Sequence, residues 1–307
     1  MIFLSAPSWA QKPDHYKDVD ATNTYIATKW DQINRSVDMF FTNQPVKQEE
    51  QKSSILVYLS SYKKEGQKIE NDVDFQFKIS LPNTSKKLKI VVEKQQDEIT
   101  NALTDSSVSN NRSLSKNGRL TDKQDDNRYT AGASFLLDKT QDFLSSLSFG
   151  IRISMPLNPY VKADLQKTYQ LSWVNIGLSQ KLILYRQEGF EEVSQVSFTR
   201  KWNQTYQTDF TNALVWTHET GKFALRHALV LTQTINSRKG LAYSVGANAK
   251  FTPTYYYNSY DTSVSYRQLL HKDWLFGTWT VGADFIKENH FTVSYTHLRA
   301  HETLSYL

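Results

Sequence analysis

Over most of its length this chain alternates between apolar and polar residues with a period of two. Clear examples lie at residues 73–81, 147–155 and 241–251. Because successive residues of a β-strand point to opposite sides, each run has one apolar face and one face of polar or very small residues. The runs are about 9 to 12 residues long, the length that a tilted strand needs to cross the hydrocarbon layer of a membrane. The pattern therefore predicts an all-β chain.

The two faces differ in the size of their side chains, and this difference indicates which face points outward. The polar face consists mainly of Ser, Gly, Thr, Asn and Lys, which are too small and too hydrated to fill a dry core. We therefore expect the apolar face to contact lipid and the polar face to line a barrel. A soluble secreted β-protein is the alternative. A helical membrane protein is excluded, because only 39% of residues are hydrophobic and no run approaches the roughly 18 to 20 apolar residues of a spanning helix.

The runs and the turn residues between them predict thirteen strands and the start of another. They are expected near residues 53–63, 71–81, 86–94, 128–138, 144–155, 159–171, 173–186, 190–202, 207–218, 223–235, 241–252, 257–270, 274–286 and 290 onward. Bacterial single-chain barrels have an even number of strands and both termini in the periplasm. We therefore expect a transmembrane antiparallel up-and-down β-barrel of 12–14 strands. With fourteen strands, the polar segment 95–127 becomes an extracellular loop.

The segments before the barrel are predicted from two short patterns. Residues 1–10 resemble the end of a signal peptide, with Ser8 and Ala10 as the small residues of a cleavage site. Residues 11–50 are expected to form a periplasmic segment, followed by the barrel at 51–292. A short amphipathic helix is predicted there, capped by Thr22 or Asn23. Its apolar face comprises Ile26, Trp30, Ile33, Val37 and Phe40.

The last residues carry a different kind of resemblance. Residues 293–303 read VSYTHLRAHET, which resembles a translated sequencing adapter. We therefore expect residues 293–307 to be a non-native artefact and the natural strand to continue differently after Thr292. His297, His301 and Glu302 fall inside this segment, so they are not interpreted as a metal site.

The polar faces of the predicted strands carry more cations than anions. The candidate lumen-facing basic residues are Lys78, Arg152, Lys162, Lys181, Lys201, Arg226, Lys250 and Arg267, with Lys89 on the same kind of face. The acidic residues assigned to these faces are Asp74, Glu93, Asp164 and Asp284. An open lumen with this excess would favour anions. The alternative is that the charges pair across neighbouring strands and close the lumen.

Motifs for catalysis, metal binding or cofactor binding do not appear in the sequence. There is no cysteine, no phosphate-binding glycine loop and no zinc-type spacing of histidines. His15, His218, His227, His271 and His290 are scattered along the chain. We expect no catalytic residues, no metal and no cofactor, and an enzyme is the less favoured interpretation. The alternative is a barrel enzyme acting on lipid or peptide, with His218 or His227 as its base.

The stretches FQFKISLPNTSKKLKIVVE, LAYSVGANAKF and YRQLLHKDWLFG resemble uncharacterised proteobacterial outer-membrane β-barrel proteins. The resemblance covers residues 53–292 and implies the fold and a place in the outer membrane of a Gram-negative cell. Its implied partners are outer-membrane lipid, lipopolysaccharide and the barrel-assembly machinery, without nucleic acid. The predicted function is a non-enzymatic barrel, either a narrow porin-like pore for small, anionic solutes or a structural surface protein.

Overall fold

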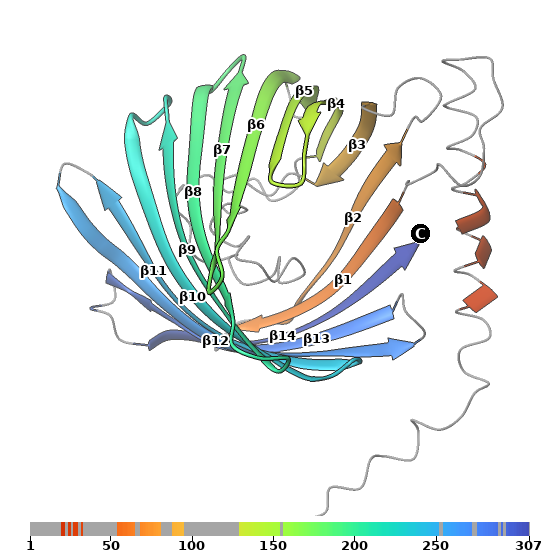
Figure 1. The fold of residues 1–307 in the computed structure, drawn as a ribbon, viewed down its shortest axis with the longest axis vertical. Coiled ribbons are helices and arrows are strands. Elements are labelled where there is room, and N and C mark those ends of the chain that lie inside the picture. Colours follow the sequence, from red (N-terminus) through yellow and green to blue (C-terminus); the bar gives the residue numbers. More distant parts are fainter. Residues whose placement is uncertain are drawn as a thin grey trace, which may run out of the picture.

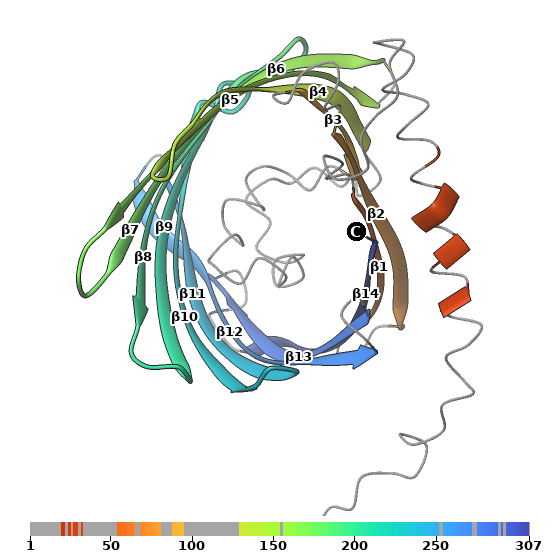
Figure 2. The same cartoon turned by 45° about the vertical axis from the view of Figure 1, so that its right-hand side comes forward.

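The computed structural model is a closed antiparallel β-barrel in which each strand pairs with its neighbours in the sequence, and β14 pairs with β1 (Figures 1 and 2). It describes residues 20, 21, 24, 25, 27–29, 32, 54–64, 68–80, 88–94, 129–153, 156–251, 254–271, 275–287, 290 and 293–306. The strands are β1 (Ser54–Lys64), β2 (Glu70–Ser80), β3 (Leu88–Lys94), β4 (Tyr129–Lys139), β5 (Phe143–Ile153), β6 (Asn158–Gln170), β7 (Asn175–Tyr185), β8 (Gly189–Lys201), β9 (Tyr206–Thr217), β10 (Lys222–Asn236), β11 (Lys239–Phe251), β12 (Tyr255–His271), β13 (Leu275–Ile286) and β14 (Val293–Tyr306). The predicted fold class is confirmed, and the upper strand number is the one observed.

The strand boundaries agree with those predicted from the alternation to within a few residues, and the last strand, β14, completes the barrel. β14 pairs with β13 from Val293 onward and with β1 up to Tyr306, so it closes the barrel. It is formed by the segment that resembles an adapter. The non-native origin of that segment stays a prediction.

Eight residues before the barrel are described, and all of them are helical. Thr24 and Thr28 donate side-chain hydrogen bonds to backbone carbonyls four residues earlier. Asp20 lies 2.8 Å from the ring nitrogen Nε2 of His271, at the end of β12. The predicted apolar face of the helix, the predicted leader at 1–10 and the predicted loop 95–127 lie outside the described residues. Among the described residues, no helix is long and apolar enough to span a membrane.

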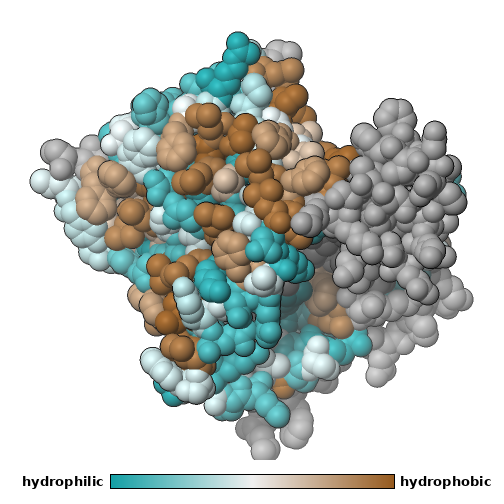
Figure 3. Space-filling view, turned by 45° about the horizontal axis from the view of Figure 1, so that its top comes forward, coloured by the Kyte–Doolittle hydropathy of each residue, from teal (hydrophilic) through white to brown (hydrophobic). Residues whose placement is uncertain are grey.

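The barrel wall has an apolar and a polar face, as the alternation predicts. Phe149, Leu184, Val245 and Val281 are about half exposed on the apolar face. The polar face is concave, because side chains from strands that are not neighbours meet there, as Arg226 of β10 meets Asp261 of β12. We therefore call the polar face inward and the apolar face outward. Hydrophobic residues gather in patches on the part of the surface seen in Figure 3.

Two rims bound the wall and are named here by the chain ends. At the first rim β1 begins and β14 ends, and the connections β2–β3, β4–β5, β6–β7, β8–β9, β10–β11 and β12–β13 lie there. The second rim holds the other connections. Where described, connections on both rims are tight: residues 237 and 238 join β10 to β11, and residues 218–221 join β9 to β10. Gly221 in the latter turn has a φ of 62°, a conformation that favours glycine.

Tyr160 of β6 lies against the inward face of β4 and β5. A β-carbon added at Gly150 would lie 2.6 Å from the Tyr160 ring and hydroxyl, and one added at Gly132 would lie 3.0 Å from that hydroxyl. The ring also packs against Tyr185 of β7, with centroids 5.9 Å apart. The absence of side chains at the two glycines therefore allows one tyrosine to bridge three strands.

Gly150→Ala should destabilise the folded barrel by about 1 to 3 kcal/mol, because the added methyl overlaps the Tyr160 ring. Urea unfolding in lipid vesicles measures the change. In a Tyr160→Ala background the same substitution should cost much less, since the three nearest atoms to the new β-carbon all belong to Tyr160. Equal costs in the two backgrounds would contradict this packing role.

Candidate functional site: the inward wall and its first rim

The eight candidate basic residues all lie at inward positions of their strands. Strand pairing puts Lys78 opposite Val91, Lys162 opposite Ile183, and Lys250 opposite Tyr256, all on the face away from the exposed apolar residues. The same reasoning places the remaining candidates Arg152, Lys181, Lys201, Arg226 and Arg267. Their contact with a solute stays a prediction.

Arg226 is the centre of a hydrogen-bonded network on the second-rim half of the barrel. Its guanidinium donates two hydrogen bonds to Asp261, at 2.6 and 3.0 Å, and one of 3.1 Å to Asn248. Asn248 in turn donates to Ser259 at 3.0 Å. The pair passes directly over Gly246, where a β-carbon would lie 2.6 Å from Arg226 Nη2. Arg226 is only 5% exposed, so its positive charge is buried in the barrel wall, where it pairs with Asp261.

Arg152 forms a second network at the same half of the barrel. Its guanidinium pairs with Glu188 in the β7–β8 connection and lies 3.8 Å from the centre of the Tyr185 ring. The Asn158 amide donates to the same Glu188 carboxylate at 3.0 Å. Arg152 is 4% exposed. Two of the eight candidates are therefore structural cations, as the alternative of a charge-paired wall predicts.

The other candidates are more accessible and differ in their partners. Lys162 lies 3.8 Å from Asp164 on its own strand. Arg267 lies over the Phe276 ring at 4.3 Å. Lys201 and Lys250 form no ion pair with any residue in the described part of the chain. Strand pairing also reveals inward acidic residues that the sequence analysis did not assign, namely Glu191, Asp209 and Asp261.

Because of these acidic residues, the predicted excess of positive charge does not extend over the whole inward face and is confined to one part of it. Among the described side chains, the inward carboxylates of Glu191, Asp261 and Asp284 lie toward the second rim, and that of Asp209 lies toward the first rim. Cations predominate at the first rim. The inward basic residues there are Lys78, Lys89, Lys201 and Arg267, joined by Arg238 and Lys239 of the β10–β11 turn.

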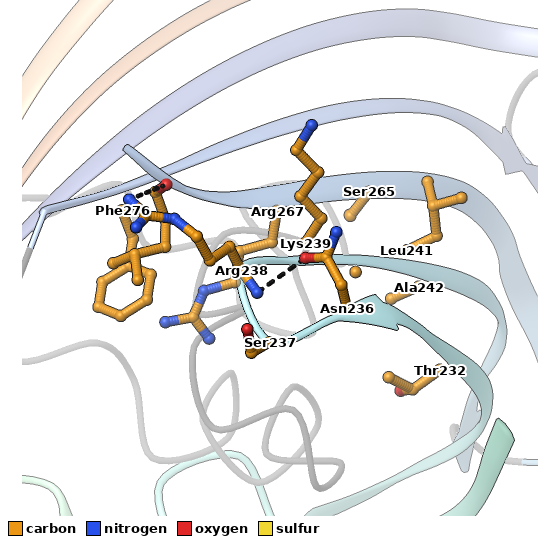
Figure 4. Close-up of a pocket in the computed structure, with 12 residues that line it drawn as sticks. Thr232, Asn236, Ser237, Arg238, Lys239, Leu241, Ala242, Ser265, Arg267 and Phe276 are labelled. Atoms are coloured by element: carbon orange, nitrogen blue, oxygen red, sulfur yellow. Dashed lines mark hydrogen bonds between the residues drawn. The ribbon is translucent and has the colours of Figure 1, made fainter. Parts of the chain in front are cut away.

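A pocket of about 260 Å³ lies at this first rim, between the β10–β11 turn and strands β12 and β13 (Figure 4). Arg238, Lys239 and Arg267 line it, together with Asn236, Ser237 and Phe276, and no acidic residue does. The turn is held by hydrogen bonds from the Arg238 backbone N–H to the Asn236 side chain, at 2.9 Å, and from the Leu269 N–H to the Arg238 carbonyl, at 2.8 Å. Arg238 Nη2 donates to the Leu269 carbonyl at 3.4 Å. The pocket is therefore a fixed, cationic recess suited to an anion.

Aromatic residues form a belt on the outward face at each rim. At the second rim seven rings follow one another across β8 to β12, with successive centroids 4.9 to 6.4 Å apart. They are Phe190, Trp216, Phe223, Phe251, Tyr255, Tyr257 and Tyr260. At the first rim the belt comprises Trp173, Trp202 and Tyr206, with the Arg200 guanidinium 3.8 Å from the Trp202 ring. Rings at both edges of an apolar band match the headgroup levels of a bilayer.

In the described part of the chain, neither histidine of the enzyme alternative hydrogen-bonds with a serine, threonine or carboxylate side chain. His218 lies in the β9–β10 turn beside the Trp216 ring, at 6.1 Å between centroids. His227 lies on the outward face of β10, where its Nδ1 hydrogen-bonds with Asn212. The one His–carboxylate pair among the described residues joins His271 to Asp20. Within that part of the chain, no three His, Cys, Asp or Glu side chains are grouped as metal ligands would be.

Solved structures similar to this chain are outer-membrane barrels of very different sequence. A loop L8 deletion mutant of OmpT, an outer membrane protein of Vibrio cholerae, is 8% identical with a TM-score of 0.49, over 83% of this chain and 99% of that one. OccK11 (OpdR) of Pseudomonas aeruginosa is 9% identical with a TM-score of 0.45, over 84% and 96%. The KdgM porin in complex with disordered oligogalacturonate is 8% identical with a TM-score of 0.39, over 82% and 99%. No protein-family model and no curated protein sequence matches the chain.

Proposed function

We propose that this chain is an outer-membrane porin-like barrel, a narrow pore for small solutes that prefers anions. The observation that carries the proposal is a wall with an apolar, belted outward face and a charged inward face that is basic at the first rim. The outer membrane of a Gram-negative cell is the proposed location, with lipid, lipopolysaccharide and the assembly machinery as partners.

The spacing of the two aromatic belts supports the membrane location. On β9, Trp216 lies ten positions after Tyr206. At about 3.3 Å per residue and a strand tilt of roughly 40°, they lie about 25 Å apart along the barrel axis. This matches the height of the apolar band of outer-membrane barrels.

The proposed anion preference comes from the first rim and not from the whole lumen. Around Arg226 and Arg152 the positive charge is matched by Asp261 and Glu188. The rim pocket, in contrast, brings Arg238, Lys239 and Arg267 together without a carboxylate in its lining. An anion entering there gains from three cations, and a cation is repelled. Because both termini of such barrels face the periplasm, this mouth is the proposed periplasmic one.

Planar-bilayer recordings in a KCl gradient test the proposal. The wild-type barrel should give single channels whose reversal potential indicates chloride preference. Replacing Arg238 and Lys239 together by Gln should lower the chloride-to-potassium permeability ratio by roughly two-fold or more. Lys222→Gln, an exposed cation at the second rim, is the matched control and should leave the ratio unchanged.

A folded barrel that never conducts would overturn the pore and leave the second candidate, a structural surface protein. The specific observation in favour of that candidate is the charge pairing of Arg226 and Arg152 inside the wall. A conducting barrel that prefers potassium would instead retain the pore and reject the role of the rim pocket.

A further inference from the structure

Between the two belts, a group of neighbouring polar residues interrupts the apolar outward face on β7–β10. Strand pairing places Gln180, Glu192, Ser194, Asn212 and His227 on this face, and we call these five residues the outer polar patch. On other described strands, outward positions hold apolar residues such as Ala133, Val161, Val245 and Val281, and also the single polar residues Ser61, Lys63, Thr208 and Thr262.

The five residues lie along a diagonal across four strands and form two hydrogen-bonded groups. Gln180 is paired with Ser194, and Asn212 is paired with both Val196 and His227. The Gln180 amide donates to Glu192 at 2.8 Å, and the Ser194 hydroxyl donates to Gln180 at 2.7 Å. His227 Nδ1 donates to the amide oxygen of Asn212. These side chains are part-buried by each other, and their remaining surface faces outward.

The depth of the patch makes it costly to expose to lipid. On β9, Asn212 is six residues from Tyr206 of the first belt and four from Trp216 of the second, so it lies near the middle of the apolar band. Ser194 is likewise four residues from Phe190 of the second belt, whereas Glu192, which is paired with Trp216, lies at the level of that belt and accepts hydrogen bonds from Gln180 and Ser194. Hydrocarbon offers neither donors nor a counter-charge, and polar groups at such depth usually face protein or water.

We propose that the outer polar patch is the contact surface for a second copy of this chain in the membrane. This inference rests on the membrane location proposed above. A two-fold axis along the membrane normal brings residues of equal depth together, so each patch meets the same residues of the partner. Ser194, Asn212 and His227 carry both donors and acceptors, which makes the part of the patch in the middle of the band complementary to itself. A different protein would need an unrelated polar patch at the same depths.

The described part of this chain does not supply the cover itself. The described helical residues lie beyond β1 and β2 in both views, whereas β7 to β10 form the other side of the barrel (Figures 1 and 2). Asp20 at the helix contacts β12 at the first rim, away from the middle of the band. Within the described residues, the patch is therefore left for a neighbour in the bilayer to cover.

Cysteine cross-linking of the full chain tests the proposal, and the natural absence of cysteine makes the readout clean. Ser194→Cys and Asn212→Cys proteins, reconstituted in phosphatidylcholine vesicles at a low protein-to-lipid ratio, should form disulfide-linked dimers on mild oxidation. Ala133→Cys on β4 and Ala283→Cys on β13 are matched controls, outward at similar depth on either side of the patch. They should stay monomeric. Absence of dimers at both patch positions, or equal cross-linking of the controls, overturns the proposal.

A second variant separates this inference from the proposed function. Asn212→Leu should weaken dimer formation in detergent at least tenfold by analytical ultracentrifugation, while the boiling-sensitive compact band is retained. A wild-type barrel that folds but is monomeric in detergent and vesicles refutes the dimer contact at the outer polar patch and leaves the membrane barrel intact. A chain that does not fold in detergent or lipid refutes the membrane barrel. Cross-linking only to another protein in native membranes refutes the second copy as occupant.

Discussion

Ending the chain after Thr292 should abolish the compact, boiling-sensitive form that a folded barrel gives on a gel. β14 pairs with β1 over ten residue pairs, from Ile55 to Lys64, and with β13 over most of its length. Without it, the facing edges of β1 and β13 lose their partners. Each unsatisfied backbone group in hydrocarbon costs several kcal/mol, so the loss exceeds the about 5 to 15 kcal/mol that holds a typical fold together.

The control for this truncation keeps the strand and changes its side chains. A chain in which residues 293–306 are replaced by alternating Val and Thr can form the same backbone ladder, and it should still fold in detergent. A compact band from the truncated chain would show that β13 and β1 close the barrel by themselves. Folding of the Val/Thr chain alone would show that this position needs a strand and not this particular sequence.

Asp261→Asn should destabilise the barrel by about 3 kcal/mol. The carboxylate accepts two hydrogen bonds from Arg226, and this guanidinium is only 5% exposed. Removing the negative charge leaves a buried cation with amide and hydroxyl partners only, which is the costly way to break an ion pair. Urea unfolding from lipid vesicles gives the free energy.

Replacing both members of the pair is the informative comparison. The double variant Arg226→Met, Asp261→Leu should recover most of the lost stability, because no unpaired charge remains in the wall. Lys201→Met is the matched control, an exposed inward cation whose loss should change the free energy by less than about 0.5 kcal/mol. A single variant as stable as the wild type would mean that water in the lumen already screens Arg226.

The period of two was sufficient to predict the strands, their approximate ends and the face of each basic candidate. This worked because a residue's side of a strand depends only on its position along that strand. The same information does not say which residues become lateral neighbours. The pairing of Arg226 with Asp261 across Gly246 depends on the register of three strands and could not be derived from any one of them.

Two features interrupt the alternation, and both were missed. A register shift near Asn248 and Ala249 puts Tyr257 and Tyr260 of β12 on the same outward face, which joins them into the second-rim belt. The outer polar patch was passed over because Gln180 is a single gap in an otherwise apolar series and Glu192 lies in a strand with weak alternation. The gap at Gln180 was the available signal. Its meaning depended on the partner strand that supplies Ser194 and Glu192.

The distance between the aromatic belts also determines which bilayers suit this barrel. A band about 25 Å high is shorter than the roughly 30 Å hydrocarbon layer of an average membrane. In such a membrane the lipid next to the wall must thin, or the belt rings on β9 and their neighbours must sink below the headgroups, and each ångström of mismatch has a cost. The bacterial outer membrane is thinner than average, so hydrophobic matching alone favours that membrane over a thicker one.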